Sequence, residues 1–198
     1  MQNNANGILM SMSNAQHLSP STPDFSDEIE LTTDDLRQLV SFAVACAQKV
    51  LPIYEQHMPD DLRPRQAIQA ATVFAASGSR SNALRMAGLA AFKASGSALN
   101  PAAKEAAKAA TQAVGAAYLH PIAKAHQVEH ILGAASHAAR AAELQAGDDP
   151  EIAAQFCQWT IDHAPATVRT VLASYPNAPA GGGRSGELLR LIDSALRP

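Results

Sequence analysis

A short stretch of the chain combines residue types at a spacing that could bind zinc. Residues 126–130 read His-Gln-Val-Glu-His, the His-x-x-Glu-His order of the inverted zinc proteases. On a helix, His126 and His130 would share one face and bind Zn²⁺, while Glu129 could act as the general base. The stretch therefore raises the hypothesis of a metal-dependent enzyme. The further ligand that this hypothesis needs would be His120, His137 or Glu143.

A helix with one polar side explains the same residues. At about 100° per residue, the histidines lie opposite an apolar stripe, so they face either solvent or a second helix contact. A zinc site also needs a third ligand, an open coordination position and a substrate cleft, and a pattern of five common residues recurs often by chance. We therefore favour exposed or hydrogen-bonded histidines, and we expect no metal and no other cofactor. The histidines are His126, His130 and His137, and the stripe is Val128, Leu132, Ala135 and Ala139.

The segment Asp60-Asp-Leu-Arg-Pro-Arg65 allows two interpretations. Two acids before a helix start complement the helix dipole, and nearby arginines can hold a carboxylate in bidentate fashion. The favoured interpretation is a helix start with internal ion pairs. In the alternative, Arg63 or Arg65 grips an acidic ligand or a partner protein.

Neither a phosphate-binding loop nor a nucleophile is recognisable elsewhere. Residues 181–186 read Gly-Gly-Gly-Arg-Ser-Gly and precede a predicted helix, whose N-terminus could accept an anion. The segment lacks the Gly-Lys-Ser/Thr ending and the preceding strand of a phosphate-binding loop, so we interpret it as a linker. The Ser, Cys and His residues match no nucleophile arrangement, and no catalytic residue is predicted.

Helices must position all of these residues. Alanine, the best helix former, provides 42 of the 198 residues, and its small side chain lets neighbouring helices approach closely. The predicted fold is all-α, a globular multi-helix bundle of about six to eight helices, with an irregular helical-repeat array as the alternative. Glycine within three Gly-Ala segments (Gly88, Gly115 and Gly133) indicates close helix crossings.

Capping and proline signals set the expected helix boundaries. Thr32-Thr-Asp-Asp35 resembles a capping box that opens the first helix, and Pro52 should end or kink it. The later helices are expected from Pro64 to about residue 77, from Asn82 to Ser95, from Pro101 to Tyr118, from Pro121 to near Gly147, from Pro150 to Pro165, over Val168–Ser174, and from Ser185 or Gly186 onward.

Composition indicates one domain over residues 31–198, preceded by a disordered or loosely attached lead over residues 1–30. The first 35 residues hold six acidic residues and no Lys or Arg, whereas the whole chain has a net charge of −3 and a pI of about 6.1. This balance argues against nucleic acid as a partner. No apolar stretch is long enough to span a bilayer, so we expect a cytoplasmic protein without a membrane partner. Buried positions are expected for Phe42, Phe74, Phe92, Phe156, Trp159 and the two thiols, Cys46 and Cys157.

Several segments together resemble a family of all-helical bacterial immunity proteins of polymorphic toxin systems. The resemblance covers roughly residues 31–197, and its most specific part runs from Tyr118-Leu-His-Pro121 to Gly133-Ala-Ala135. His126 is not a histidine that we expect in relatives, which weakens the zinc interpretation. The other matching residues are Asp60-Asp-x-Arg-Pro-Arg65, Ala67-Ile68, Ala117, Gln127-x-x-His-Ile-Leu132, His137-Ala-Ala-Arg140, Glu143, Ala164-Pro165 and Gly186-Glu-Leu-Leu-Arg190.

The resemblance implies a protein without chemistry of its own, which neutralises a cognate toxin protein by binding it. The alternatives are the metal-dependent enzyme above and a helical bundle that binds a small acidic ligand. A homo-oligomer is also possible, because the exposed side of an alanine-rich helix resembles a dimer interface. The candidate partner-binding residues are Asp61, Arg63, Arg65, His120, Gln127 and His130.

Overall fold

A computed structural model describes residues 28–197, which fold into eight α-helices and two short 3₁₀ helices and contain no strand. The all-α prediction is therefore confirmed. The elements, in chain order, are α1 (Thr33–His57), α2 (Arg63–Ser77), α3 (Asn82–Ser97), α4 (Pro101–Gly115), η1 (Ala116–Tyr118), η2 (Ala125–Gln127), α5 (Val128–Gln145), α6 (Pro150–His163), α7 (Ala166–Ala173) and α8 (Gly183–Leu196).

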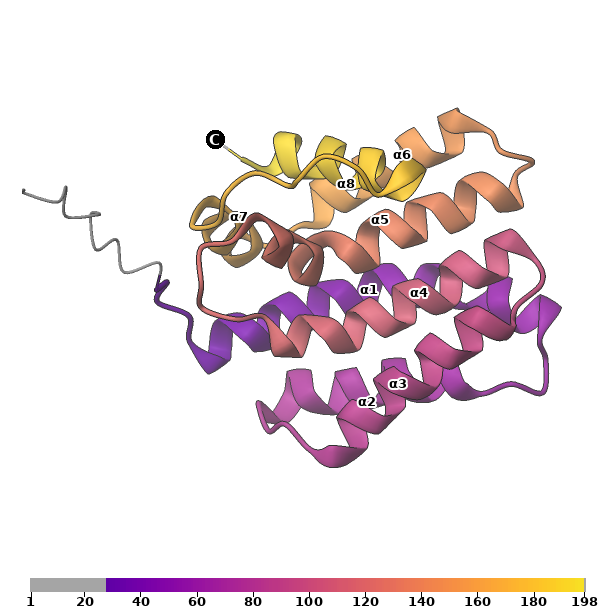
Figure 1. Cartoon of the computed structure of the whole chain (residues 1–198), viewed down its shortest axis with the longest axis horizontal. Helices are drawn as coiled ribbons and strands as arrows, with labels where there is room; N and C mark the ends of the chain where they lie inside the picture. The colour runs from indigo at the N-terminus through magenta and orange to yellow at the C-terminus, as the bar shows by residue number, and fades with distance from the viewer. Residues whose placement is uncertain (1–27, 198) are drawn as a thin grey trace, which may run out of the picture.

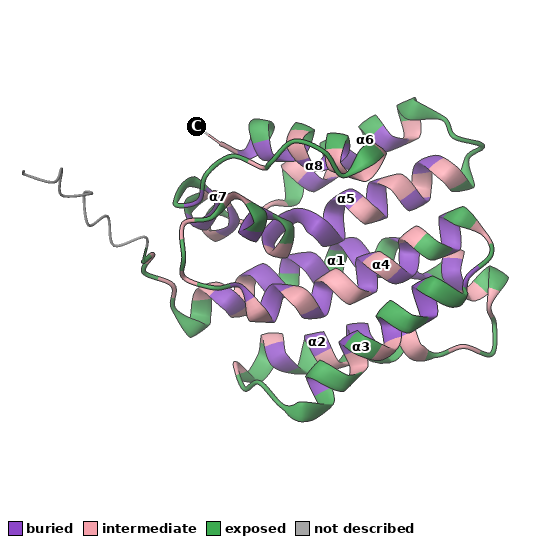
Figure 2. Ribbon diagram, in the orientation of Figure 1, coloured by how far each residue is buried: buried purple, intermediate pink, exposed green. Residues whose placement is uncertain are grey.

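The helices form three tiers (Figure 1). The central tier contains α1, α4 and α5, which pack against one another; α2 and α3 cover one side, and α6, α7 and α8 cover the other. Buried residues concentrate along the central tier (Figure 2). In a repeat array each unit contacts only its chain neighbours, whereas α1 also packs against α4, α5 and α7. The globular bundle is therefore confirmed, and the alternative array is wrong.

Small residues hold the central helices close together. Seven alanines of α4 are buried, from Ala102 to Ala113. A Cβ placed on Gly88 of α3 would lie 2.8 Å from Cγ1 of Val114 in α4, so a side chain there would push the two helices apart. A Cβ on Gly133 of α5 would lie 3.0 Å from Gln112 of α4. The prediction of close helix crossings at the glycines is confirmed at these contacts.

Local signals set most helix starts correctly. Thr32 and Asp35 form the predicted capping box: the Thr32 side chain accepts from the Asp35 amide at 3.1 Å, and the Asp35 carboxylate accepts from the Thr32 amide at 2.9 Å. The side chains of Asn100 and Asp149 cap α4 and α6, each directly before a proline. These contacts satisfy amides that have no partner within their own helix.

Two expectations, for Pro121 and Phe92, were wrong, and the expected end or kink at Pro52 is excluded only as an end. Pro52 does not end the first helix, since α1 continues to His57; the proline is exposed, where water can satisfy the carbonyl that it leaves without a partner. The fifth helix does not open at Pro121, because residues 119–127 form a loop and the η2 turn. Phe92 is not buried: 62% of it is exposed on α3.

The N-terminal prediction falls mostly outside the described residues, which begin at Glu28. Just ahead of α1, the amide of Ile29 donates to the carbonyl of Pro121 at 2.9 Å, and Glu28 pairs with Ile122 in an isolated β-bridge. The start of the domain is therefore tied to the loop before η2. Both thiols are buried and unbonded to each other, as expected. Within residues 28–197 we find no helix that combines the length and apolarity of a membrane span.

Candidate functional site

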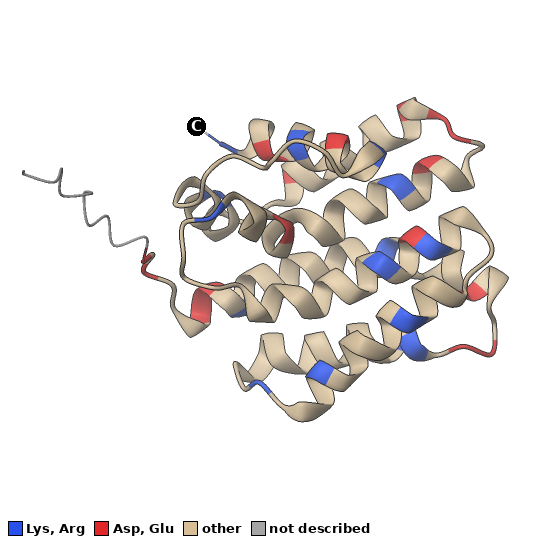
Figure 3. Ribbon diagram, in the orientation of Figure 1, with Lys and Arg blue, Asp and Glu red and all other residues tan. Residues whose placement is uncertain are grey.

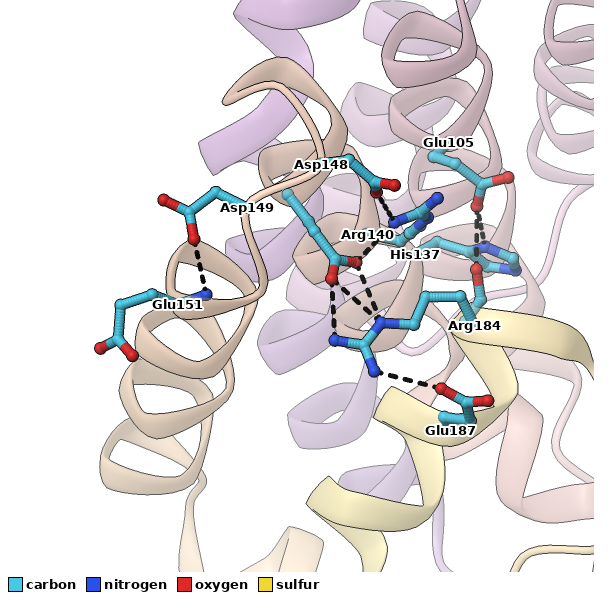
Figure 4. A network of polar contacts seen from close by, with 10 residues as sticks. Glu105, His137, Arg140, Asp148, Asp149, Glu151, Arg184 and Glu187 are labelled. Carbon is cyan, nitrogen blue, oxygen red and sulfur yellow. Dashed lines mark hydrogen bonds and ion pairs between the residues drawn. The ribbon is translucent and has the colours of Figure 1, made fainter.

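A network of charged side chains joins α4, α5 and α8 (Figure 4). At one end, Nδ1 of His137 on α5 lies 2.6 Å from Oε2 of Glu105 on α4. The same carboxylate accepts from Lys108 at 2.7 Å and from the Ser185 hydroxyl of α8 at 3.2 Å. Burial opposes the charged form of Glu105, but the hydrogen bonds from His137 and Lys108 outweigh it and lower its pKa to about 2. Glu105 therefore stays ionised and ties three helices together.

At the other end of the network, a buried carboxylate is held between two guanidinium groups. The Glu143 side chain is 3% exposed and accepts from Arg140 at 2.8 Å and from Arg184 at 2.8 Å and 3.0 Å. Arg140 also pairs with Asp148, and Arg184 pairs with Glu187. Burial raises the pKa of Glu143, but hydrogen bonds from Arg184 and Arg140 outweigh that effect and lower it overall. Glu143 is thus an ion-paired anchor between α5 and α8.

A cavity of about 230 Å³ lies beside this network, between α5 and the chain that leads into α8. His126, Glu129 and His137 line one side, and the glycine-rich segment 179–186 lines the other. The segment is fixed rather than loose, because Arg190 donates to the carbonyls of Pro179 at 3.0 Å and Gly181 at 2.8 Å. Our interpretation of this segment as a linker is therefore incomplete: part of it forms the first turn of α8.

The structure does not assemble the zinc-motif residues into a ligand set. Since α5 begins only at Val128, His126 lies in the preceding η2 turn. There its Nε2 lies 2.8 Å from the side-chain amide nitrogen of Gln127, within hydrogen-bonding distance. Glu129 accepts from Gln112 of α4 at 2.8 Å. Among residues 28–197, no three His, Cys, Asp or Glu side chains come together as metal ligands.

His130 and His137 both lie where α5 packs against α4. His137 pairs with Glu105, whereas Nδ1 of His130 is buried without a hydrogen-bond partner within the described part of the chain. A Cβ on Gly115 would lie 3.4 Å from that nitrogen, which places the ring against the end of α4. Burial lowers the pKa of His130 and so favours the neutral ring. Of His126, His130 and His137, only His126 is exposed.

Protein purified without an affinity tag is expected to contain well below one zinc ion per chain. The reason is geometric, because His126 lies in η2 and His130 on α5, and no third ligand joins them among residues 28–197. Elemental analysis measures the metal content directly. One zinc per chain, lost together with thermal stability in the His126→Ala variant, would contradict this expectation.

The buried side-chain amide of Gln127 fixes the segment between η1 and α5 (residues 119–127), which we call the corner. Gln127 is 5% exposed, and its Oε1 accepts from the amide of His120 at 3.0 Å. The carbonyl of His120 accepts from the hydroxyl of Tyr175 at 2.7 Å, while the His120 side chain is exposed. The corner is therefore fixed through backbone groups. Of the candidates here, only the His120 ring is free to touch a partner without rearrangement.

The arginines in the first turn of α2 are engaged by carboxylates of the same chain. Arg63 donates to Asp61 through Nε at 2.8 Å and Nη2 at 2.6 Å, and Asp61 also accepts from the Tyr54 hydroxyl at 2.5 Å. Arg65 makes a bidentate pair with Glu55 of α1, with both distances 2.7 Å. Hydrogen bonding to Arg63 holds the pKa of Asp61 well below its usual range. The favoured interpretation, a helix start with internal ion pairs, describes this geometry.

Sequence reasoning missed Glu105, Arg184 and Tyr54 as members of these clusters. Glu105 had a weak signal, because Lys108 follows it by three residues on a predicted helix face. Arg184 is 41 residues from Glu143, and Tyr54 lies on a different helix from Arg63. No local spacing rule connects such residues.

The free energy of unfolding is expected to fall as the pH decreases from about 5 towards 2. A carboxyl whose pKa is lower in the folded chain stabilises the fold above its unfolded pKa, and this contribution is lost as the pH falls to the folded value. For Glu105 that window runs from its ordinary 4.5 down to about 2; the lowered pKa of Glu143 acts in the same direction. Urea unfolding between about pH 7 and pH 3 measures the effect. The Glu105→Gln variant should show a shallower decline, and an equal decline would contradict the assignment.

Comparison with known proteins gives one match. A family model described as "Imm-5 like putative immunity protein" matches residues 30–167. The match spans α1 to the start of α7, including the Asp60–Arg65 loop, the corner and all of α5. No curated protein matches the chain, and neither does any solved structure.

Proposed function

This chain belongs to the Imm-5 like immunity protein family, and from that membership we propose that it neutralises a cognate toxin protein by binding it and occluding the toxin's active surface. The single observation that carries the proposal is the family match, which covers most of the described domain. The partner is a protein, and the site of action is the cytoplasm.

The internal bonding of the polar side chains supports a role in binding rather than in turnover. Glu105, Asp61 and Glu143 each pair with a Lys or Arg of the same chain, namely Lys108, Arg63 and Arg184. A group that is fixed in this way keeps the helices rigid, and a rigid surface loses little conformational entropy when a partner docks. The same clusters would have to break before they could take part in proton transfer or ligand binding.

The predicted contact residues divide by accessibility. Arg65 and His120 are exposed and can meet a partner directly. Gln127 is buried, and His130 packs against α4. We propose that the buried residues, with Asp61 and Arg63, shape the start of α2 and the corner, which leaves Arg65 and His120 as the members of this set that a partner can reach.

Co-production with the product of the neighbouring gene tests the proposal. Cells that express this neighbour alone should stop growing, and co-expression of the chain should restore growth and yield a complex that co-purifies. The outcome that contradicts the proposal is a neighbour whose toxicity is unchanged by the chain, with no complex recovered. A chain with no toxic neighbour in its genome would count against it as well.

A further inference from the structure

The outer face of α3 exposes three large apolar side chains in one stripe. Met86, Leu89 and Phe92 are 52%, 47% and 62% exposed, and their spacing of three residues places them on one side of the helix. The opposite side of α3 is already satisfied, because Leu84, Gly88, Ala91 and Ala94 are buried. The stripe therefore takes no part in the core, and contiguous exposed apolar side chains of this kind typically mark interaction sites.

Two unpaired cations share this face. Arg85 and Lys93 are exposed, and neither forms an ion pair within residues 28–197. At 100° per residue, Lys93 lies between Met86 and Leu89 around the helix, and Arg85 lies beside Phe92. We call these five residues (Arg85, Met86, Leu89, Phe92 and Lys93) the α3 face.

The surroundings of the α3 face have one sign of charge. Residues 62–104 contain six Lys and Arg residues and no Asp or Glu, and α2 and α3 carry blue segments without red ones (Figure 3). Arg63 and Arg65 are neutralised by carboxylates from outside this range. Arg80 is also engaged, because it donates to the Ala117 carbonyl at 2.6 Å and lies over the Tyr118 ring. The positive charge in this region that no carboxylate of the described chain pairs with therefore lies at the α3 face, on Arg80 and on exposed Lys104.

The position of α3 leaves this face open. The helix belongs to an outer tier, and its extensive contacts within the described chain are with α2 and α4. Exposed residues follow its outer side (Figure 2). No other helix of the described chain covers it.

We propose that the α3 face is the surface that docks the cognate toxin, and that the toxin presents an apolar patch rimmed by acidic side chains. This inference rests on the proposed function. Phe92 and Met86 are the side-chain types that anchor interfaces, and the flanking cations select a partner of opposite charge. A second copy of the chain is a poor occupant, because a two-fold dimer through this face would oppose Arg85 and Lys93 to the same cations.

The test measures binding of the purified neighbouring gene product to the full-length chain and its variants. Phe92→Ser removes the aromatic anchor and should weaken binding by about thirtyfold or more, since central aromatic residues dominate interface energies. The double variant Arg85→Glu with Lys93→Glu should weaken binding at least about tenfold and reverse its salt dependence. Both variants change exposed side chains only, and circular dichroism with thermal unfolding verifies that they fold.

Two control variants change exposed side chains outside the α3 face. Leu191 on α8 is 49% exposed, so Leu191→Ser repeats the loss of an exposed apolar group away from the α3 face. Lys124→Glu makes a single charge reversal at an exposed lysine of the corner before η2. Both controls should bind the neighbour with the affinity of the original chain.

The remaining outcomes are distinguishable. If the original chain binds the neighbour and the α3-face variants bind equally well, the surface assignment is wrong while the proposed function stands. Loss of binding in Lys124→Glu alone would overturn the assignment in favour of the corner. If light scattering shows a dimer that Phe92→Ser dissociates, the face is a self-interface and the assignment also fails. Absence of any binding by the original chain overturns both proposals.

Discussion

Replacing Glu143 by alanine is expected to lower the free energy of unfolding by about 2–4 kcal/mol. Removing one member of a buried ion pair typically costs about 3–5 kcal/mol, because the remaining charge is left without a partner. Here the loss is smaller, since Arg184 is 38% exposed and can recruit water, while Arg140 keeps Asp148. Urea unfolding followed by circular dichroism gives the value.

The matched control for this prediction is Glu187→Ala. Glu187 pairs with the same Arg184, but its side chain is 57% exposed, and exposed ion pairs contribute about 0–1 kcal/mol. If the two variants lose equal stability, Glu143 is not the anchor between α5 and α8 that the geometry describes.

Replacing Gly186 by alanine is expected to destabilise the fold by about 1–3 kcal/mol, the usual range for a side chain forced into filled space. A Cβ at this position would overlap the carbonyl oxygen of Gly181, which is a backbone atom and cannot rotate away. The first turn of α8 and the segment before it would have to shift, and the hydrogen bonds from Arg190 would lengthen. Thermal and urea unfolding report the change.

Gly96→Ala provides a control, because this substitution is expected to stabilise the fold rather than destabilise it. Gly96 lies in α3, and a Cβ there would meet no atom within 4 Å. Alanine has a higher helix propensity than glycine, so this variant should gain up to about 1 kcal/mol. A stabilised Gly186→Ala variant would show that the loop before α8 is not packed as described.

The helical architecture could be predicted from the sequence because its signals are local. Two helix starts are marked by residues that lie within four positions of each other: Thr32 with Asp35, and Asn100 with Pro101. On α5 the predicted apolar stripe is buried, but burial extends beyond it to all of residues 131–136, because α5 is packed on several sides. The false start at Pro121 shows the limit of such rules: a proline also suits a loop, and here the backbone around it pairs with residues 28 and 29.

The exposed position of Phe92 could not be predicted because α3 is apolar on several sides. Met86, Leu89 and Phe92 make a stripe as regular as that of Leu84, Gly88 and Ala91, and the small residues turned out to face the core. The reason is steric: in this alanine-rich bundle a helix approaches its neighbour through its smallest residues, as Gly88 does with Val114. A prediction from hydrophobicity alone would therefore bury the wrong side of α3.

Only part of the candidate site could be predicted, because most of its paired side chains are distant from each other in the sequence. The sequence raised internal ion pairing at Asp60–Arg65, and Asp61 and Arg63 do pair within that segment. Arg65 instead meets Glu55 on the preceding helix. The link between Glu143 and Arg184 needs the packing of α5 against α8, which no motif encodes.

Titration of the purified toxin's activity against the chain distinguishes the occlusion that we propose from chemical modification of the toxin. We expect inhibition to be complete at one chain per toxin molecule, and separation of the complex to return toxin of unchanged mass and full activity. Inhibition by a small fraction of an equivalent, leaving toxin that is cleaved or covalently altered, would contradict it.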